Sequence, residues 1–242
     1  VNPALAVHVI GRVHLTELLA TLADQDFQDF EVVVSDQSDT RNVGEVCARY
    51  SDQIAIVRVD NRAGLRQAAA NTNVAMRHAT GHILKIMFQD DFFCHNGALR
   101  ILSEMFQRPD VQWALCGSCI TRDGEIFESP MVPQMNPNVH LGKNTVSSPS
   151  VLALRSGTRL EFDEELIWLM DGDFYKRCAD QLGAPAICPD ILVANRLHPE
   201  QVSASVSPQL RRRELTYMRS KHRTSERLGN RLHFIKQWLK AR

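Results

Sequence analysis

The chain has 242 residues, 44% of them hydrophobic, and its 28 basic and 28 acidic side chains cancel to a formal charge of zero. This size and composition fit one large folded domain, or one domain with an appendage, with enough apolar residues for a core. No apolar run approaches the roughly 20 residues that cross a bilayer, which excludes a protein built of membrane-spanning helices.

The six cysteines have no spacing typical of a disulfide framework. Cys116 and Cys119 form one isolated pair, without a second pair or a His cluster at zinc spacing, so we do not expect a zinc site. No signal peptide is visible in the sequence. Together these features predict reduced thiols in a cytoplasmic protein.

Apolar runs of strand length alternate along the chain with apolar residues at helical spacing. The expected strands are residues 4–10, 30–36, 54–59, 83–88, 111–120, 151–154 and 191–198. The expected helices are residues 15–25, 64–79 and 96–107, with another that begins just after residue 173. This order predicts an α/β fold with a mainly parallel central sheet and helices on both faces.

Three of these strands end in acidic residues, at Asp36, at Asp60 and at the adjacent pair Asp90 and Asp91. In an open α/β sheet, ligands bind outside the carboxyl ends of the strands, so we expect an acidic mouth at that edge. A hard divalent cation carrying phosphate oxygens would offset the repulsion between the two adjacent carboxylates. Ordinary turn chemistry at a strand end is the alternative, and the stretch alone leaves both interpretations open.

An anionic ligand at such a mouth needs positive partners, and Arg12, Arg62 and Arg66 are available on the intervening loops. We carry Arg66 forward as a candidate cofactor-binding residue. The alternative for each arginine is a solvated surface charge. His198 follows the last expected strand, where a lone histidine is more often structural than a ligand.

Residues 125–150 differ from the rest of the chain, because four prolines interrupt them with Asn and Ser between. A long irregular segment inside a compact domain is usually functional or mobile, and we assign it to the rim that receives the second substrate. Asp171 and Asp173 come next, just ahead of a helix. Asp171 is either the cap of that helix or a general base beside a reacting hydroxyl, and both interpretations stay open.

Six pieces of sequence then follow one another in a characteristic order. They are Gln25–Asp36, Asn73 eight residues before Gly81, Lys85–Asp91 with its Phe-Gln-Asp-Asp ending, Ser148–Arg155, Met170-Asp-Gly-Asp173, and Asn195–Ser203 with its Arg-Leu-His. In this order they resemble the family 2 glycosyltransferases, inverting enzymes of the A-type nucleotide-sugar fold. The third and fifth pieces resemble the Asp-x-Asp motif and the Glu-Asp-x-Asp segment of that family.

The resemblance implies a role for each matching residue. Asp36 would accept a hydrogen bond from the nucleotide base, and Asp90 would lie near the ribose. Asp91 would bind Mg²⁺ or Mn²⁺ on the diphosphate, and His198 would approach the metal or the pyrophosphate. Asp171 would take the proton from the acceptor hydroxyl during hexosyl or pentosyl transfer.

The resemblance also implies the partners of the protein. The donor is a nucleoside-diphosphate sugar, with a UDP-sugar favoured over a GDP- or dTDP-sugar. The acceptor is a saccharide or a lipid-linked molecule, as in the synthesis of surface polysaccharide or glycolipid.

The chain departs from the family pattern at two places. The family's first strand usually ends in Pro-Thr-x-Asn, where this chain has His8-Val-Ile-Gly-Arg12. Met170 stands where the family has Glu before the base, which removes a like charge that would act on the pKa of Asp171. Two alternatives remain: a non-catalytic sugar-nucleotide-binding module, and a sugar-nucleotide nucleotidyltransferase, which would call for more than one glycine in the first loop.

The last residues lie outside the resemblance, so we divide the chain into a glycosyltransferase domain, 1–207, and a helical tail, 208–242. The tail holds eleven Lys/Arg and two Asp/Glu, a net charge of +9, which leaves −9 on the rest of the chain. This asymmetry marks a boundary in composition.

Leu228, Leu232, Ile235 and Leu239 recur in the tail at helical spacing, next to Trp238 and several basic residues. A basic amphipathic helix with Trp is typical of a helix that lies on a membrane surface, here the inner face of the membrane. Packing on the domain or against another copy is the alternative. Nucleic-acid binding is not expected, because no recognised module accompanies the charge.

Overall fold

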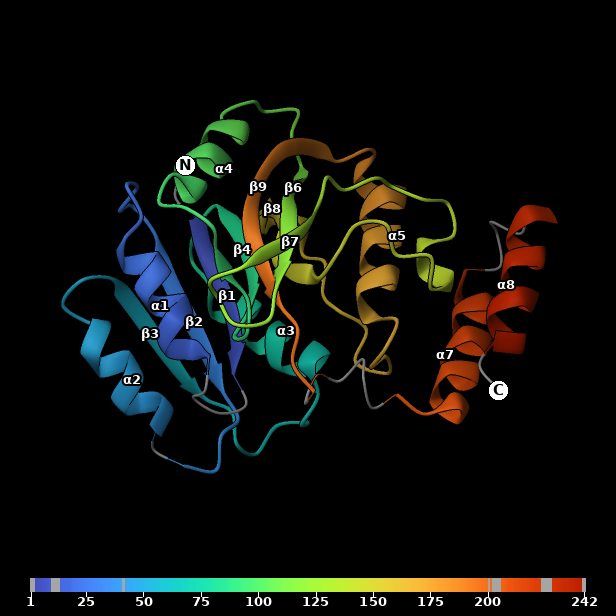
Figure 1. Ribbon diagram of the computed structural model, residues 1–242, viewed down its shortest axis with the longest axis horizontal. Helices are drawn as coiled ribbons and strands as arrows, with labels where there is room; N and C mark the ends of the chain where they lie inside the picture. The colour runs from blue at the N-terminus through green and yellow to red at the C-terminus, as the bar shows by residue number, and fades with distance from the viewer. Residues whose placement is uncertain are drawn as a thin grey trace.

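The computed structural model describes residues 3–9, 14–40, 42–199, 201, 206–222 and 228–240, and for residues 3–9 and 228–231 it describes the backbone alone. Arg12 and the rest of the first loop therefore lie outside the described residues, as does Ser203. A central sheet with helices packed around it forms the body of the molecule (Figure 1). Two C-terminal helices lie at the end opposite to α2 and β3.

The sheet contains nine strands within the described residues, and eight of them follow the order β3-β2-β1-β4-β8-β6-β9-β5, with β7 paired to β6. Their bounds are β1 Pro3–Val9, β2 Glu31–Asp36, β3 Ala55–Asp60, β4 Ile83–Phe88, β5 Phe92–Phe93, β6 Trp113–Thr121, β7 Phe127–Met131, β8 Leu152–Arg155 and β9 Ala186–Arg196. Each expected strand is present within a few residues of its expected bounds.

Six strands of the sheet run in one direction. Strands β1 to β4 are mutually parallel neighbours. Strand β8 is antiparallel to both β4 and β6, and β9 is parallel to β6, so β6 and β9 share the direction of β1. Only β5, β7 and β8 run the other way among the described strands. The sheet is therefore mainly parallel, as predicted, and the six carboxyl ends meet at one edge, on the lower side of Figure 1.

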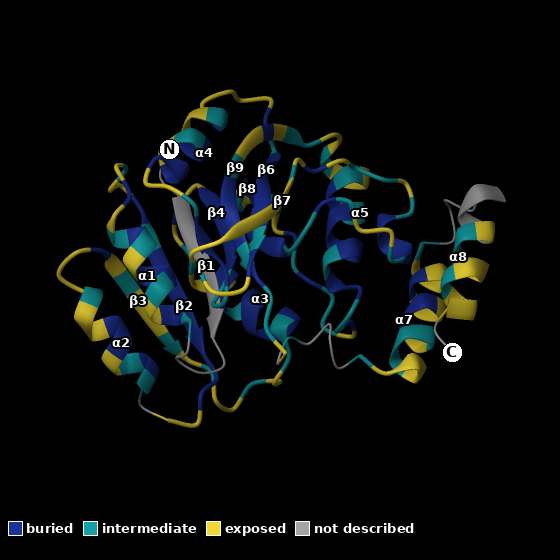
Figure 2. Cartoon of the chain, in the orientation of Figure 1, coloured by how far each residue is buried: buried dark blue, intermediate teal, exposed yellow. Residues whose placement is uncertain are grey.

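The helices are α1 Leu15–Ala23, α2 Asn42–Tyr50, α3 Ala68–His78, α4 Ala98–Met105, α5 Met170–Leu182, α7 Pro208–Lys221 and α8 Leu228–Lys240, with short 3-10 turns at Val139–Leu141 and Pro149–Val151. Helix α1 illustrates why they form, because its leucines at positions 15, 18, 19 and 22 are all fully buried. Burying one such side chain stabilises the fold by about 1.5–3 kcal/mol. Figure 2 shows the buried residues concentrated in the sheet and on the inner faces of the helices.

The structure contains one helix, α2, that the sequence did not predict. No helix was expected between the second and third strands, yet Val43, Val46 and Cys47 are buried at helical spacing there. Parallel neighbours such as β2 and β3 need a crossover connection, usually a helix, so the parallel sheet itself calls for this element. Two boundaries also differ: α3 begins at Ala68 rather than at Gly64, and the irregular segment 125–150 includes strand β7.

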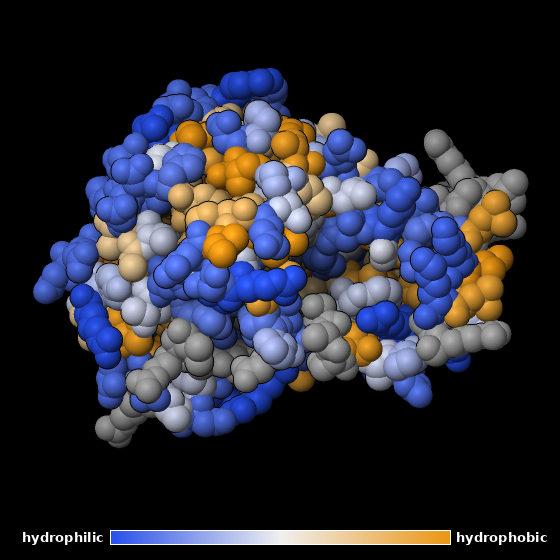
Figure 3. Space-filling model, in the orientation of Figure 1, coloured by the Kyte–Doolittle hydropathy of each residue, from blue (hydrophilic) through white to orange (hydrophobic). Residues whose placement is uncertain are grey.

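The tail helices pack on the body of the protein. Glu214, Leu215 and Met218 of α7 are buried. Helix α8 contacts α7 and the turn Val139–Leu141, and leaves an apolar face exposed, which is visible at the right of Figure 3. In the described part of the chain, no helix combines the length and apolar character needed to cross a bilayer. The domain boundary at residue 208 stays a prediction.

Candidate active site

Asp91 is a buried carboxylate whose two oxygens are both engaged by the protein. Its Oδ1 accepts the backbone N–H of Arg196 at 3.1 Å, and its Oδ2 lies 2.9 Å from the hydroxyl of Ser148. Burial and then the neighbouring charge of Asp90 raise its pKa to about 7. Asp91 therefore holds the ends of β4 and β9 together, by contacts made within the protein.

Asp90 and His198 form a pair at the same edge, in a more accessible position. Nε2 of His198 lies 3.1 Å from Oδ2 of Asp90, and the two side chains are 23% and 21% exposed. The ring of His14, just before α1, lies 5.3 Å from the His198 ring. Burial, followed by the charges of Arg196 and His198, lowers the pKa of His14. Three segments far apart in the sequence therefore meet around Asp90.

Residues 144–148 connect this edge to the start of α5. Asn144 Nδ2 donates to Oδ2 of Asp171 at 2.7 Å and to the carbonyl of Ser147 at 2.9 Å. At the other end of the segment, the hydroxyl of Ser148 lies 2.5 Å from Oδ1 of Asn195, besides its contact with Asp91. The segment therefore places Asp171 and Asp91 in one hydrogen-bonded network.

The backbone of this segment is strained at Ser147, whose φ of 103° lies in a region that non-glycine residues rarely adopt. Its hydroxyl bonds the hydroxyl of Ser118 and the amide of Asn195, both at 2.9 Å. The buried hydroxyl of Tyr175 donates to its carbonyl at 3.3 Å. Such strain costs on the order of 1–3 kcal/mol and is found most often at functional sites.

Asp171 lies in the first turn of α5 and is half-buried. Burial raises its pKa to about 6, although hydrogen bonds from the N–H of Gly172 and from Asn144 oppose the shift. A carboxylate of this kind is ionised at neutral pH and yet more basic than an ordinary Asp. These properties suit a general base, because proton transfer is most efficient when the pKa of the base lies near the operating pH.

Asp36 at the end of β2 is fully buried, and both its oxygens have partners. Ser38 donates to Oδ1 through its backbone N–H at 2.9 Å and through its hydroxyl at 2.5 Å, while Arg58 Nε donates to Oδ2 at 2.8 Å. Nearby, the side chain of Asn71 accepts hydrogen bonds from Ser35 and Asn61. The expected contact of Asp36 with a nucleotide base stays a prediction, and a base would approach a carboxylate already neutralised by Arg58.

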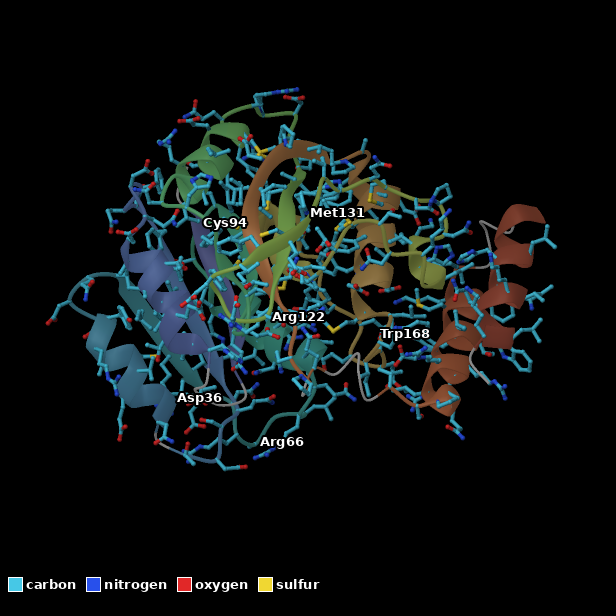
Figure 4. All side chains as sticks on the ribbon, in the orientation of Figure 1. Asp36, Arg66, Cys94, Arg122, Met131 and Trp168 are labelled. Carbon is cyan, nitrogen blue, oxygen red and sulfur yellow. The ribbon has the colours of Figure 1, made fainter. Side chains whose placement is uncertain are left out.

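Arg66 is exposed and pairs with Asp39, to which the sequence assigned no role. Figure 4 shows Arg66 below Asp36, at the edge where the parallel strands end. Arg62 pairs in the same way with Asp60. The structure thus places Arg66 at the expected edge but without contact to Asp90, Asp91 or Asp171, and its role toward a cofactor stays a prediction.

Several residues of the site were not singled out from the sequence. Asn144 contacts Asp171, Ser148 contacts Asp91, and Asn195 contacts Ser148. Glu214 of α7 contacts the backbone before Asp171. Ser148 and Asn195 begin two of the characteristic pieces, which was the only signal for them. Asn144 lies in the irregular segment, and Glu214 in the tail, where no motif pointed to either residue.

The residues at the strand edge fit a divalent cation whose coordination is completed by substrate phosphates and water. In the described part of the chain no group of three His, Cys, Asp or Glu side chains is placed to bind a metal ion. Mg²⁺, however, is usually bound by one or two carboxylates together with substrate phosphates and water, and imidazole suits transition metals. Asp90 and His198 would supply two such ligands.

The open, mainly parallel sheet with helices packed around it has the architecture of the A-type glycosyltransferases. The model of the family described as "Glycosyl transferase family 2" matches residues 13–158, more than half of the chain. The chain therefore belongs to glycosyl transferase family 2. The matched region includes Asp36, Asp90 and Asp91 and ends before Asp171.

Solved structures of similar fold include proteins from S. aureus and Pyrobaculum calidifontis. Residues 1–349 of TarS from S. aureus, crystallised with UDP-GlcNAc, superpose with a TM-score of 0.69 at 18% identity, covering 91% of this chain and 66% of that one. The mannosyltransferase PcManGT from Pyrobaculum calidifontis, with GDP-Man and Mn²⁺, gives 0.65 at 18% identity, covering 93% and 65%. The chain thus spans slightly less than two thirds of these relatives. No curated protein matches the sequence.

Proposed function

We propose that the protein moves a sugar from a nucleoside-diphosphate donor to an acceptor hydroxyl with inversion, and that Asp171 is the general base. The observation that carries this proposal is the position of Asp171, half-buried at the start of α5 and tied through Asn144 to the segment that also holds Asp91. Membership of the family supports glycosyl transfer. The inverting mechanism and the base are our own assignment.

An acceptor hydroxyl is a weak nucleophile and must lose its proton as the glycosidic bond forms. A carboxylate within hydrogen-bond reach accepts that proton and contributes typically 10²–10⁴-fold. The pKa of Asp171, raised to about 6, keeps it ionised at pH 7 and increases its basicity. A single in-line displacement at the anomeric carbon would then invert the configuration.

We assign the cation, Mn²⁺ or Mg²⁺, to Asp90 and His198 rather than to Asp91. The sequence resemblance implies the opposite arrangement, with Asp91 on the metal and Asp90 near the ribose. Both oxygens of Asp91 are, however, engaged by Arg196 and Ser148, whereas the Asp90–His198 pair is accessible. When bound, the cation supplies charge neutralisation to the leaving diphosphate. Asp91 then serves to fix the strand ends that carry its neighbours.

In this proposal the donor site lies between the ends of β1, β2 and β3. Asp36 contacts the nucleobase of the donor, and Arg66 makes a second contact with the donor. We favour a UDP-sugar over a GDP- or dTDP-sugar. The TarS complex contains a UDP-sugar, which supports this choice, while the second neighbour contains GDP-Man. The acceptor would be a saccharide or a lipid-linked molecule in polysaccharide or glycolipid synthesis, and α8 would contact the inner face of the membrane.

The test uses UDP-GlcNAc and GDP-Man as probes, with Mn²⁺ present. It measures nucleotide binding, and it measures the nucleoside diphosphate that is released when the sugar is transferred to water or to an added saccharide. We expect Asp171→Asn to lower release by about 10²–10⁴-fold while leaving nucleotide affinity unchanged. Asp180→Asn is the matched control, since this exposed acid lies on the same helix and pairs with Lys176.

Equal turnover by Asp171→Asn and the unmodified protein would remove Asp171 from the mechanism. Tight binding of a nucleotide sugar without any release would favour the non-catalytic binding module. Formation of a nucleotide sugar from a nucleoside triphosphate and a sugar phosphate would favour the nucleotidyltransferase.

A further inference from the structure

Glu214 of α7 is a buried carboxylate that binds three successive backbone N–H groups just before α5. Its Oε1 accepts the N–H of Ile167 at 2.8 Å, and its Oε2 accepts those of Trp168 at 3.0 Å and Leu169 at 2.8 Å. Successive amides of this kind form an anion-binding nest, and the N-terminal end of a helix favours negative charge. Glu214 is thus an anion supplied by the chain itself to the N-terminal end of α5.

The same helix holds the first turn of α5 at a second point. Asp173 is fully buried. Its carboxylate pairs with Lys221 and His222 at the end of α7, both at 2.9 Å, and with Arg177 of α5 at 2.7 Å. Asp171 lies between the two contacts, two residues after Leu169 and two before Asp173. Figure 4 shows Trp168, within the nest, on the side of α5 that faces α7.

We propose that Glu214 is a positioning residue for Asp171: its carboxylate fixes the backbone that aims the base and keeps a negative charge beside it. The tail is then part of the catalytic apparatus, although it lies outside the region matched by the family model. This inference rests on the proposed role of Asp171, which it deepens.

The groups that face Asp171 determine the direction in which its pKa should change when Glu214 is replaced. The titratable groups set against it are Glu214 on α7 and Tyr175 on α5 itself, and the segment 144–148 contributes the neutral amide of Asn144. Burial is the main cause of the raised pKa of Asp171, and the charge of Glu214 acts in the same direction. Removing that charge must therefore lower the pKa of the base.

Glu214→Gln removes the charge but keeps one oxygen acceptor for the nest. We expect the pKa of Asp171 to fall below about 6, while burial, the main cause of the raised pKa, keeps it above the ordinary value of 3.8. The measurement is a pH titration of the aspartate carboxyl carbons by ¹³C NMR, with the Asp171 signal assigned by its loss in Asp171→Asn. Glu165→Gln is the matched control, because this exposed acid joins the same loop to α7 through Arg213 without touching the nest.

A purely structural role would leave the Asp171 titration of a folded Glu214→Gln variant unchanged, and that result would overturn the proposal. Glu214→Asp provides the second variant, since it keeps the charge but shortens the side chain. We expect its donor turnover to fall on the order of 10²-fold with unchanged nucleotide affinity, as for a base held out of position. Unchanged turnover in Glu214→Asp would also count against positioning.

The titration needs no substrate, so its outcome is separate from that of the proposed function. If Asp171→Asn keeps full turnover while Glu214→Gln lowers the pKa of Asp171, the catalytic assignment fails and the coupling between the two acids stands. If Asp171→Asn is inactive and Glu214→Gln leaves the titration unchanged, the positioning role fails alone.

Discussion

Asn144 donates a 2.7 Å hydrogen bond to the carboxylate of Asp171, and it is a loop residue rather than part of α5. Its own Oδ1 accepts the N–H groups of Val146 and Ser147, at 2.8 and 3.1 Å, so the amide is fixed from both sides. The proposed base is therefore oriented by the irregular segment that we assign to the acceptor rim. On these two assignments, acceptor binding and the orientation of the base would be linked through the side chain of Asn144.

Replacing Asn144 by Ala should raise the pKa of Asp171. The hydrogen bond from Asn144 favours the charged form and lowers that pKa, so its loss moves the value above about 6. The acid limb of the pH–rate profile should shift to higher pH, opposite to the shift expected for Glu214→Gln. Thr145→Val is the control, because Thr145 bonds the carbonyl of Gln134 and not the acid. An unshifted limb in Asn144→Ala would contradict the prediction.

The assignment of the cation to Asp90 rather than Asp91 gives a second prediction. Asp90→Asn should abolish Mn²⁺-dependent binding of UDP, measured by calorimetry, because the accessible carboxylate of the Asp90–His198 pair is lost. Asp91→Asn should keep it, since an amide oxygen can still accept the N–H of Arg196. The reverse pattern would return the cation to Asp91.

The strands were predictable because their apolar runs are local signals, and the acids at their ends followed directly. The Asp90–His198 pair was not predictable, because it depends on β5, which pairs Phe92 and Phe93 with β9. A two-residue strand leaves no periodic pattern in the sequence. That strand nevertheless places Asp91 against Arg196 and thereby brings His198 to Asp90.

The tail shows why burial is harder to predict than helix formation. The basic composition and helical spacing of residues 208–242 identified the helices but suggested an appendage. Glu214 is one of two acids in that stretch, and it is buried with its carboxylate on the backbone just before α5. Its role depends on three backbone amides, and backbone donors are invisible in an amino-acid pattern.

The strain at Ser147 predicts an unusual order of stability among variants. Ser147→Ala and Ser147→Gly both lose the hydroxyl, but only glycine adopts a φ of 103° without a steric cost. The glycine variant should therefore be the more stable of the two by about 1 kcal/mol, which is at the lower end of the strain that such a backbone conformation costs. Chemical denaturation at pH 7 measures the difference. A more stable alanine variant would show that the backbone there is not strained.

The buried side chain of His140, which lies against His222 at the end of α7, should make the stability of the protein depend on pH. Its ring is buried 5.1 Å from that of His222, and burial followed by the charge of His222 lowers its pKa to about 4. Since the ordinary value is 6.5, the unfolded state binds the proton first, and the contribution of His140 to stability falls as the pH drops from 6.5 to 4. The part of the stability change between pH 7 and pH 5 that depends on His140 should be a loss of about 2 kcal/mol, while the raised pKa values of Asp91 and Asp171 act in the opposite direction in both proteins.

His140→Asn should remove that part of the pH dependence, because the amide does not titrate. Denaturant midpoints of both proteins at pH 7 and pH 5 give the comparison. His78→Asn is the matched control, since His78 is exposed on α3, away from the tail. Equal pH dependence in His140→Asn and the unmodified protein would contradict the assignment.

The exposed face of α8 predicts binding to anionic vesicles. Leu232, Ile235 and Leu239 lie on one side of the helix and are 62%, 51% and 45% exposed, while Phe234 packs toward the body of the protein. The net charge of +9 on the tail adds attraction to anionic lipid. The protein should float with vesicles containing phosphatidylglycerol, and less with neutral ones, while added salt should weaken the binding.

Serine at all three positions should abolish flotation, whereas Ile187→Ser should leave it unchanged, because Ile187 is an exposed apolar residue on β9. The salt dependence separates charge from apolar insertion, since the serine variant keeps every basic residue of the tail. Flotation that survives the three serines would assign binding to charge alone. A concentration-dependent dimer that the serines dissociate, without any flotation of the unmodified protein, would instead assign this face of α8 to a second copy of the chain.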